Sequence, residues 1–205
     1  MTRLLLVRHG ETEWNRQKRH QGQKDIPLNE FGRQQVSALS RRLKTEPINA
    51  LYTSDLCRAW ETAKTISINF SELVIVKDAR LREMNFGEWE GLTWSEIREK
   101  DPSVVENWLN YLAEKGPPGG ENLFRFSKRI RNFSDEIIKS HSNETILLVA
   151  HGGTMMVLIC LLLGHPIERY WQFRIEKASL SDICVYPEGA IINQLNDTSH
   201  LGLQE

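Results

Sequence analysis

Four short apolar runs recur along the chain, each bounded by polar or turn-forming residues. They are Leu4–Val7, Ala50–Thr53, Leu73–Val76 and Thr145–Ala150. A continuous apolar run of this length is typical of a strand that is covered on both faces. Toward the end of the chain, Ser179–Tyr186 and Ala190–Leu195 alternate on either side of a turn at 187–189, which predicts a hairpin.

Between these runs, apolar residues recur with the three-to-four-residue spacing of helices that bury one face. The predicted helices are Asn29–Leu43, Leu56–Ile66, Trp94–Lys100, Ser103–Glu114, Leu123–Ser140 and Gly153–Leu163. Asn29 is placed to cap the first of them, and Gly164 is placed to end the last. Strands that alternate with helices predict a three-layer α/β/α fold with a mostly parallel central sheet, in which the last strands are candidates for antiparallel pairing.

The turn-rich run at 116–120 marks the segment before it as an insertion. We expect one domain over residues 1–205, with a small helical insertion at about 92–120. The chain length agrees with this, because domains typically have ~100–200 residues.

Composition excludes several classes of protein. The 26 Lys and Arg side chains balance 27 Asp and Glu, for a formal net charge of -1 at pH 7, which is unlike a strongly basic nucleic-acid binder. The three cysteines form no C-x-x-C pair. The longest apolar run, Met155–Leu163, is far shorter than the ~20 residues that span a bilayer. We therefore expect a cytoplasmic protein with no nucleic-acid or membrane partner. The sequence leaves open whether the protein forms a homodimer.

Two of the apolar runs end in the same way, in LLLVRHG at 4–10 and LLVAHGG at 147–153. Ligands of open α/β sheets bind beyond the carboxyl ends of the strands. If the two strands are neighbours, His9 and His151 meet at one crevice; otherwise they are unrelated loop histidines. Arg8 precedes His9, and Arg58 lies at the start of the helix after another strand. Arginines and histidines at strand ends indicate a cradle for an oxyanion or phosphate.

Five sequence blocks occur in order along nearly the whole chain. They are LVRHGETEWN at 6–15, YTSDLCRAWETA at 52–63, LREMNFGEWEG at 81–91, GGEN at 119–122 and VAHGG at 149–153. Together they resemble the signature of the histidine phosphatase superfamily, the phosphoglycerate-mutase-like proteins. The resemblance implies that fold, a small phosphorylated metabolite as the partner, and no cofactor.

The resemblance also implies a role for each matching residue. His9 would be the nucleophile that takes up the phosphoryl group, and Glu83 would be the acid that protonates the leaving oxygen. The phosphoryl oxygens would be bound by Arg8, Asn15, Arg58 and His151. Gln21 and Gly22 would contact the substrate, although a solvated surface loop is the alternative for the cationic stretch around them. His200, near the end of the chain, is a further candidate for lining the site.

General chemistry supports these roles. A neutral imidazole is a good nucleophile, and an acceptor such as a glycine carbonyl on its second nitrogen would hold its tautomer. Guanidinium groups stabilise phosphoryl oxygens with fixed geometry, so the site can work without a metal. Backbone N–H groups at Gly152, where a helix opens, would bind the same anion. A neighbouring anionic phosphate favours the protonated form of a carboxyl group, as an acid catalyst requires.

Several residues have alternative interpretations. Glu83 could instead be a surface carboxylate paired with Arg80 or Arg82, and Glu88 and Glu90 are nearby competitors for its role. A core is favoured over a pocket floor for three tryptophans, Trp89, Trp94 and Trp108.

The remaining histidines are not expected to take part in catalysis or binding. His141 and His165 are expected to be structural or exposed. None of the six histidines has the partner spacing of a zinc site, so we expect no metal.

The same site could serve a mutase or a phosphatase. A mutase must shield its phosphohistidine from water with a long lid and tail, whereas this chain is compact. Gly87–Ile97 resembles the alpha-ribazole and broad-specificity phosphatases, and Asn196–Leu201 resembles phosphatases of that branch, phosphoserine phosphatases included. We therefore expect hydrolysis of small phosphomonoesters, with alpha-ribazole 5′-phosphate as the first candidate. A phosphoglycerate mutase, a phosphoserine phosphatase and a non-catalytic phospholigand-binding domain stay as alternatives.

Overall fold

The computed structural model describes residues 1–110 and 114–202, and within them it has one six-stranded sheet in the order β3-β2-β4-β1-β5-β6. The strands are β1 (Thr2–Arg8), β2 (Ala50–Thr53), β3 (Ile75–Lys77), β4 (Thr145–Ala150), β5 (Leu180–Tyr186) and β6 (Gly189–Asp197). The first four in sequence pair in parallel, whereas β5 and β6 are antiparallel. The predicted sheet, mostly parallel with antiparallel strands at the end of the chain, is confirmed.

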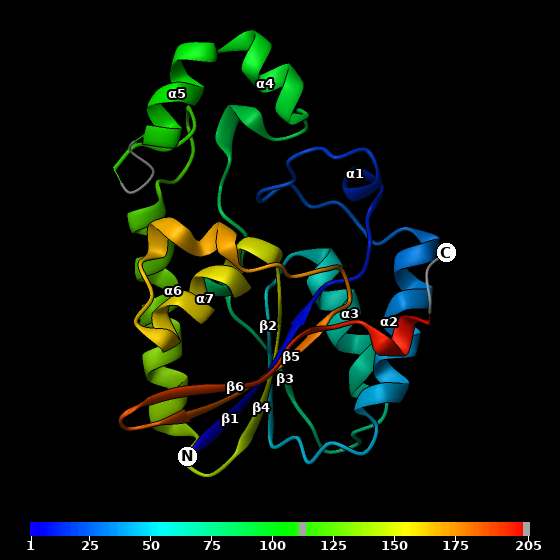
Figure 1. The fold of residues 1–205 in the computed structure, drawn as a ribbon. Coiled ribbons are helices and arrows are strands. Elements are labelled where there is room, and N and C mark those ends of the chain that lie inside the picture. The colour runs from blue at the N-terminus through cyan, green and yellow to red at the C-terminus, as the bar shows by residue number, and fades with distance from the viewer. Residues whose placement is uncertain (111–113, 203–205) are drawn as a thin grey trace.

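Helices cover both faces of this sheet (Figure 1). They are α1 (Glu13–Arg16), α2 (Glu30–Leu43), α3 (Cys57–Ser67), α4 (Trp94–Lys100), α5 (Pro102–Asn110), α6 (Leu123–Ser140) and α7 (Gly152–Leu163), with short 3-10 turns η1 (Ala79–Leu81), η2 (Gly87–Trp89), η3 (Ile167–Gln172) and η4 (Ser199–Leu201). Alternation along β1 separates the two cores. Leu4 and Leu6 join the core under α6 and α7, and Leu5 and Val7 join the core under α2 and α3. The three-layer fold is confirmed.

The predicted ends of two helices are also confirmed. The Asn29 side chain caps α2 by accepting a hydrogen bond from the Gly32 N–H at 2.7 Å. Gly164 ends α7 in the left-handed conformation, with a φ of 64°, which glycine adopts without steric cost.

Other boundaries differ from the prediction because pairing and turns override the apolar pattern. β3 starts at Ile75, which pairs with Leu51. Leu73 lies before the strand, and its backbone N–H donates to the carbonyl oxygen of Phe70. Helix α5 is described as far as Asn110, and residues 111–113 of the predicted helix lie outside the described residues. The four-residue helix α1 is too short for any periodicity to reveal.

The helices α4 and α5 stand at one end of the molecule, beyond the sheet (Figure 1). They enclose a small third core in which the buried Trp89 ring packs edge-on against Trp108, with centroids 5.4 Å apart, and against Trp94 at 6.3 Å. The core interpretation of the three tryptophans is confirmed. Within the described residues, no helix is both long and apolar enough to cross a bilayer.

Candidate functional site

The carboxyl ends of β1 and β4 bring two histidines together. These strands are parallel neighbours in which Arg8 pairs with Ala150, so the next residue of each strand, His9 and His151, lies at the same edge. Their ring centroids are 5.1 Å apart, and both side chains are buried. The sheet therefore places two segments that are far apart in the sequence at one site.

His9 is held in a single tautomer. Its Nδ1 lies 2.7 Å from the carbonyl oxygen of Gly10, and its Nε2 accepts a hydrogen bond from Nε of Arg58 at 3.2 Å. Because Arg58 can only donate, the His9 proton is on Nδ1 and the lone pair is on Nε2. Burial, followed by the charges of Arg58 and Arg8, holds the pKa of His9 well below its usual value. The ring is therefore neutral at physiological pH.

Arg58 contributes a buried cation without an ion pair. It lies in the first turn of α3, where the Asp25 carboxylate accepts the Cys57 N–H. The guanidinium donates to the carbonyl oxygens of Lys24 at 2.8 Å and Gly22 at 2.7 Å. Burial lowers its pKa from the usual value, yet a guanidinium stays charged at neutral pH. Within residues 1–110 and 114–202, Arg58 forms no ion pair.

Arg8 and His151 each leave a buried nitrogen unused. Arg8 donates from Nη1 to the carbonyl oxygen of Ile175 at 2.6 Å, and Nε2 of His151 lies 2.8 Å from the Ser54 hydroxyl. Among the described residues, neither Nε of Arg8 nor Nδ1 of His151 has a hydrogen-bond partner. Burial is the main cause that lowers the pKa of both groups, that of His151 far below its usual range. Unpartnered buried nitrogens beside two cations indicate a site for an anion.

Glu83 lines the same cavity as Arg8, His9 and Arg58. Its carboxylate accepts the backbone N–H of Met84 at 2.9 Å and that of Gly153 at 3.0 Å. A Cβ at Gly153 would clash with Oε1 of Glu83, so any larger residue at this position would displace the carboxylate from its present place.

The alternative partners considered for Glu83 are engaged elsewhere. Arg82 forms an ion pair with Asp55, and Arg80 forms one with Asp78. The interpretation of Glu83 as a surface carboxylate paired with Arg80 or Arg82 is therefore wrong.

Arg129 on α6 clamps the segment that carries Glu83, and the sequence analysis missed it. Its guanidinium donates to the carbonyl oxygens of Arg80, Arg82 and Glu83 at 2.6–2.8 Å. Glu121 of the GGEN block orients it through an ion pair of 2.8 Å. The only sequence signal for these contacts of Arg129 was the GGEN block at 119–122, which contains Glu121 and which the sequence alone linked to no function.

Asn15, Gln21 and Gly22 all reach the site. The Asn15 amide oxygen accepts the Thr12 N–H, the Thr12 hydroxyl donates to Gln21 Oε1 at 2.9 Å, and the Gly22 carbonyl accepts from Arg58. They line a cavity of about 150 Å³. The cavity is bounded by Arg8, His9, Asn15, Arg19, His20, Gln21, Gly22, Arg58, Glu83 and Phe86.

The two carboxylates near Glu83 lie outside this cavity. Glu90 Oε1 accepts the backbone N–H groups of Gln23 and Phe86, so Glu90 positions the loop around Gly22. Glu88 is exposed, 3.7 Å from Lys100.

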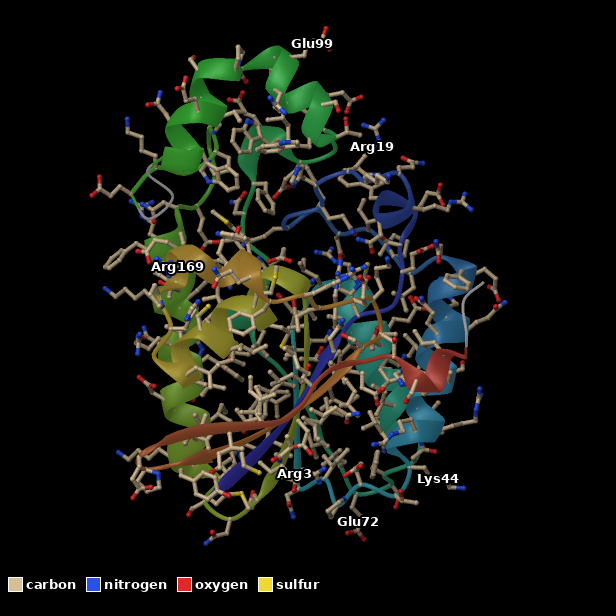
Figure 2. The ribbon with its side chains drawn as sticks, in the orientation of Figure 1. Arg3, Arg19, Lys44, Glu72, Glu99 and Arg169 are labelled. Atoms are coloured by element: carbon tan, nitrogen blue, oxygen red, sulfur yellow. The ribbon has the colours of Figure 1, made fainter. Side chains whose placement is uncertain are left out.

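The cationic stretch after α1 lies partly in the site wall. Arg19, His20 and Gln21 line the cavity, whereas its other cations, Arg16, Lys18 and Lys24, are exposed to solvent. Arg19, which Figure 2 shows on the loop below α4, donates to the Gly91 carbonyl at 2.6 Å and to Glu96 of α4 at 3.0 Å. The His20 ring lies against Phe86, with centroids 5.0 Å apart, and burial lowers its pKa.

A second cavity of about 210 Å³ adjoins the first and shares Arg8, Glu83 and Phe86 with it. Its other lining residues are Met84, Phe126, Gly152, Gly153, Met156 and Tyr170. Gly152 was predicted from the sequence as a phosphate-binding residue. The apolar side chains of this cavity were not predicted, because in the sequence they cannot be told from core residues.

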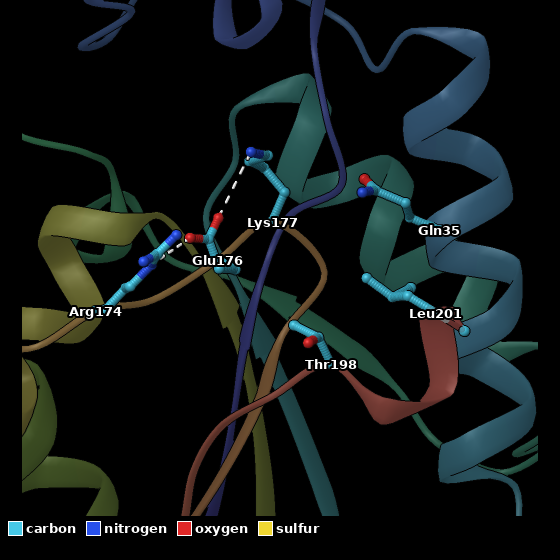
Figure 3. Close-up of a pocket in the computed structure, with 7 residues that line it drawn as sticks. Gln35, Arg174, Glu176, Lys177, Thr198 and Leu201 are labelled. Carbon is cyan, nitrogen blue, oxygen red and sulfur yellow. Dashed lines mark hydrogen bonds and ion pairs between the residues drawn. The ribbon is translucent and has the colours of Figure 1, made fainter. Parts of the chain in front are cut away.

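The structure does not bring His200 to either cavity. Its Nε2 lies 2.9 Å from the Ala178 carbonyl oxygen, beside η4. A separate hollow of about 530 Å³ lies on that side of the molecule. Its two described cations share one carboxylate, because Glu176 lies 2.6 Å from Arg174 and 3.6 Å from Lys177 (Figure 3). Each cation that the structure describes in this hollow therefore has a carboxylate partner, unlike Arg8 and Arg58 at the strand-end site.

Possible metal ligands are dispersed in the part of the chain that the structure describes. No group of three or more His, Cys, Asp or Glu side chains is arranged there to hold a metal ion.

Comparison with known proteins agrees with this geometry. The family model of the histidine phosphatase superfamily (branch 1) matches residues 4–198. Phosphoserine phosphatase 1 of Hydrogenobacter thermophilus is 35% identical over 202 residues, which cover 98% of this chain and 95% of that protein. The alpha-ribazole phosphatase structure from Shigella flexneri superposes with a TM-score of 0.88 at 30% identity, covering 96% of each chain.

A third relative carries another substrate name. The mycobacterial glucosyl-3-phosphoglycerate phosphatase has a TM-score of 0.84 at 31% identity, over 95% of this chain and 98% of that one. The protein is therefore a member of the histidine phosphatase superfamily, branch 1.

Proposed function

We propose that the protein hydrolyses phosphomonoesters through a phosphohistidine at His9. The observation that carries this proposal is the state of His9, which is neutral and has its Nε2 lone pair free of a proton. It lies beside Arg8 and Arg58, neither of which forms an ion pair within the described residues. A neutral imidazole can attack phosphorus, and the cations of Arg8 and Arg58 stabilise the charge on the phosphoryl oxygens.

In the first step, the Nε2 lone pair of His9 forms a bond to phosphorus while the bond from phosphorus to the ester oxygen breaks. The Arg58 N–H that rests on Nε2 turns to a phosphoryl oxygen as the lone pair is used. Protonated Glu83 gives its proton to the leaving oxygen, which departs as an alcohol. The Gly10 carbonyl accepts the Nδ1–H throughout and stabilises the positive charge that develops on the ring.

In the second step, Glu83 acts as the base. It takes a proton from a water molecule as the water oxygen attacks phosphorus, and the bond between phosphorus and Nε2 breaks. Inorganic phosphate leaves, His9 returns to its neutral form, and Glu83 is protonated again for the next cycle. No metal takes part in this scheme.

Several oriented donors support the binding of the phosphoryl oxygens. Nε of Arg8 is a buried donor without a partner among the described residues. Nδ1 of His151 is also without one there, and it donates in the tautomer in which Nε2 accepts a hydrogen bond from the Ser54 hydroxyl. Asn15 uses its amide oxygen within the loop, which leaves its NH₂ group to donate. The start of α7 at Gly152 adds backbone N–H groups and the positive end of a helix.

The substrate we propose is a small phosphomonoester, with alpha-ribazole 5′-phosphate as the first compound to test. The named relatives act on different phosphate esters, so they support the chemistry more than one substrate. A screen of kcat/KM should include alpha-ribazole 5′-phosphate, phosphoserine, 3-phosphoglycerate and sugar phosphates, with the mutase product measured in parallel. Transfer to a second hydroxyl in preference to water would assign the protein to the mutases instead.

Trapping of the phosphoenzyme tests the mechanism directly. Acidic and alkaline quenching of the enzyme with a ³²P-labelled ester should yield a phosphoprotein that is labile in acid and stable in alkali. It should be absent from His9→Ala and present in His165→Ala, which alters a histidine that contacts Gln172 outside the site. Label in His9→Ala at the wild-type level would exclude His9 as the nucleophile. A wild-type protein that neither turns over nor labels would favour the non-catalytic alternative.

A further inference from the structure

The cavity of about 210 Å³ beside Glu83 lies beyond the phosphoryl group in the proposed mechanism. The two cavities meet at Arg8, Glu83 and Phe86, and His9 lines only the smaller one among their described lining residues. The leaving oxygen must lie next to Glu83, because Glu83 gives it a proton. The carbon part of the substrate then extends from Glu83 into the larger cavity.

The walls of this larger cavity are apolar. The side chains concerned are Met84, Phe86, Phe126, Met156 and Tyr170. Met84 and Phe126 are buried, and the other three pack against the same core, so the wall is held in place before a ligand arrives. Among the described lining residues, only Arg8 and Glu83 are charged, and both already act on the phosphoryl group and the leaving oxygen.

This wall discriminates against charged leaving groups. An ammonium or carboxylate group that enters an apolar cavity loses its hydration and finds no new partner. The Tyr170 hydroxyl can contact a neutral polar group, and it stays protonated because burial and the charge of Glu83 raise its pKa to about 12.

The cavity is also large enough for an aromatic group. An apolar cavity of roughly 150 Å³ holds a benzene molecule. A cavity of about 210 Å³ therefore accepts one aromatic ring with a few further carbon atoms.

We propose that the substrate is a phosphomonoester of a neutral, largely apolar alcohol or phenol, and that the apolar cavity binds this group. The inference rests on the proposed function, because it takes Glu83 as the group beside the leaving oxygen. Between two compounds that occur in the names of relatives, alpha-ribazole 5′-phosphate has an uncharged leaving group, a ribose that carries an aromatic benzimidazole, whereas phosphoserine carries an ammonium and a carboxylate.

Three esters of primary alcohols test the substrate class, since their leaving oxygens are chemically alike. They are 2-phenylethyl phosphate, ethyl phosphate and O-phospho-L-serine. Burial of the phenyl ring should make kcat/KM for 2-phenylethyl phosphate about 10- to 100-fold higher than for ethyl phosphate. Phosphoserine should be hydrolysed no faster than ethyl phosphate.

The outcomes separate this inference from the proposed function. Equal kcat/KM for 2-phenylethyl and ethyl phosphate, or a preference for phosphoserine, overturns the inference and leaves the phosphatase chemistry intact. Failure to hydrolyse any of the three esters and p-nitrophenyl phosphate overturns the proposed function, and the inference with it.

Two lysine variants on α7 test whether this cavity is responsible. Met156→Lys places a charge in the cavity wall, and Leu163→Lys places one on the exposed surface of the same helix. Met156→Lys should lower the ratio of kcat/KM for 2-phenylethyl over ethyl phosphate by about 10-fold or more, and Leu163→Lys should keep the wild-type ratio. Met156→Leu should retain it as well.

Because a ratio is measured, a general loss of activity cancels. If circular dichroism shows that Met156→Lys is unfolded, Met156→Gln repeats the test without a charge. A wild-type ratio in folded Met156→Lys or Met156→Gln would overturn the assignment of the cavity.

Discussion

The two ends of strand β1 place the same residue types in opposite environments. At its start, Arg3 lies between Asp182 and Glu46, with both ion pairs at 2.8 Å, and these carboxylates raise its pKa. At its end, Arg8 donates to a backbone carbonyl and forms no ion pair among the described residues, and burial lowers its pKa. Figure 2 shows Arg3 at the end of the sheet opposite Arg19 of the site wall.

The histidines at the two ends differ in the same way. Near the start of β1, His141 lies 2.6 Å from the Glu144 carboxylate and 2.8 Å from the Tyr52 hydroxyl. At the other end, His9 and His151 are surrounded by cations and have no carboxylate partner in the described residues. A cation that has a carboxylate partner stabilises the fold, whereas a buried cation without one is available to a substrate anion.

The largest expected effect is the loss of turnover in His9→Ala. Because the nucleophile is removed, kcat for p-nitrophenyl phosphate should fall by roughly 10³-fold or more. His141→Ala, at the other end of the strand, should keep kcat within about twofold. Initial rates and circular dichroism of both variants provide the measurement, and turnover near the wild-type rate in His9→Ala would contradict covalent catalysis.

Replacement of the two β1 arginines by methionine should separate activity from stability. Arg8→Met should lower kcat/KM by about 10²- to 10³-fold, because it removes an oriented cation from the transition state. Arg3→Met should leave kcat/KM nearly unchanged and lower the free energy of unfolding by about 1 kcal/mol or less, since its ion pairs are partly exposed. Initial rates and urea unfolding of both variants provide the measurement. An equal fall of kcat/KM in Arg8→Met and Arg3→Met would contradict the different roles of the two arginines.

Glu83→Gln should slow poor leaving groups more than good ones. Glutamine cannot give a proton, so kcat for an alkyl phosphate should fall about 10²-fold. The leaving group of p-nitrophenyl phosphate needs little protonation, so kcat for that ester should fall about 10-fold or less. Asp182→Asn, the partner of Arg3, is the matched carboxyl-to-amide control and should affect both esters equally and slightly. Equal slowing of both esters by Glu83→Gln would argue against its role as the acid.

Stability should decrease in mild acid because of His9 and His151. Their pKa values are lowered in the folded protein, so below the unfolded value of about 6.5 the unfolded chain binds protons that the native protein does not. The free energy of unfolding should therefore fall between pH 7.5 and 5.5, by about 1 kcal/mol for each histidine. Urea titrations of wild type and His9→Phe at both pH values test this, and a variant with the wild-type loss would contradict it.

The smallest expected effect is that of a chelator. In the proposed mechanism, guanidinium groups supply the charge that other phosphatases take from metal ions. Dialysis against EDTA should leave kcat/KM unchanged within error. A loss that added Mg²⁺ or Zn²⁺ restores would show that the two cations are insufficient.

The local features of this chain were readable from its sequence. Continuous apolar runs located β1 and β4, and the polar residues after each run located His9 and His151. Asn29 and Gly164 were recognised as helix ends because their side-chain chemistry, or its absence, acts within a few residues. Arg58 was recognised from its place at the start of the helix after a strand, and the family blocks added Glu83; the roles of both stay proposals for the tests above.

The features that depend on distant contacts were not readable. Nothing near Arg129 in the sequence indicates that it binds the carbonyls behind Glu83, and nothing near Met156 distinguishes a cavity wall from a core. His200 was placed near the site by its neighbours, yet its ring contacts Ala178.

The sequence by itself therefore determined where the strands lie, which of them are apolar throughout and which alternate, and which chemical groups stand at their ends. These features follow from residue type and local spacing. Only the tertiary structure decided which charges have partners. Arg3 and Arg8 are alike in the sequence, and they differ because the sheet places carboxylates beside one and leaves the other among carbonyls and histidines. The shape of the apolar cavity likewise depends on five segments that meet only after folding.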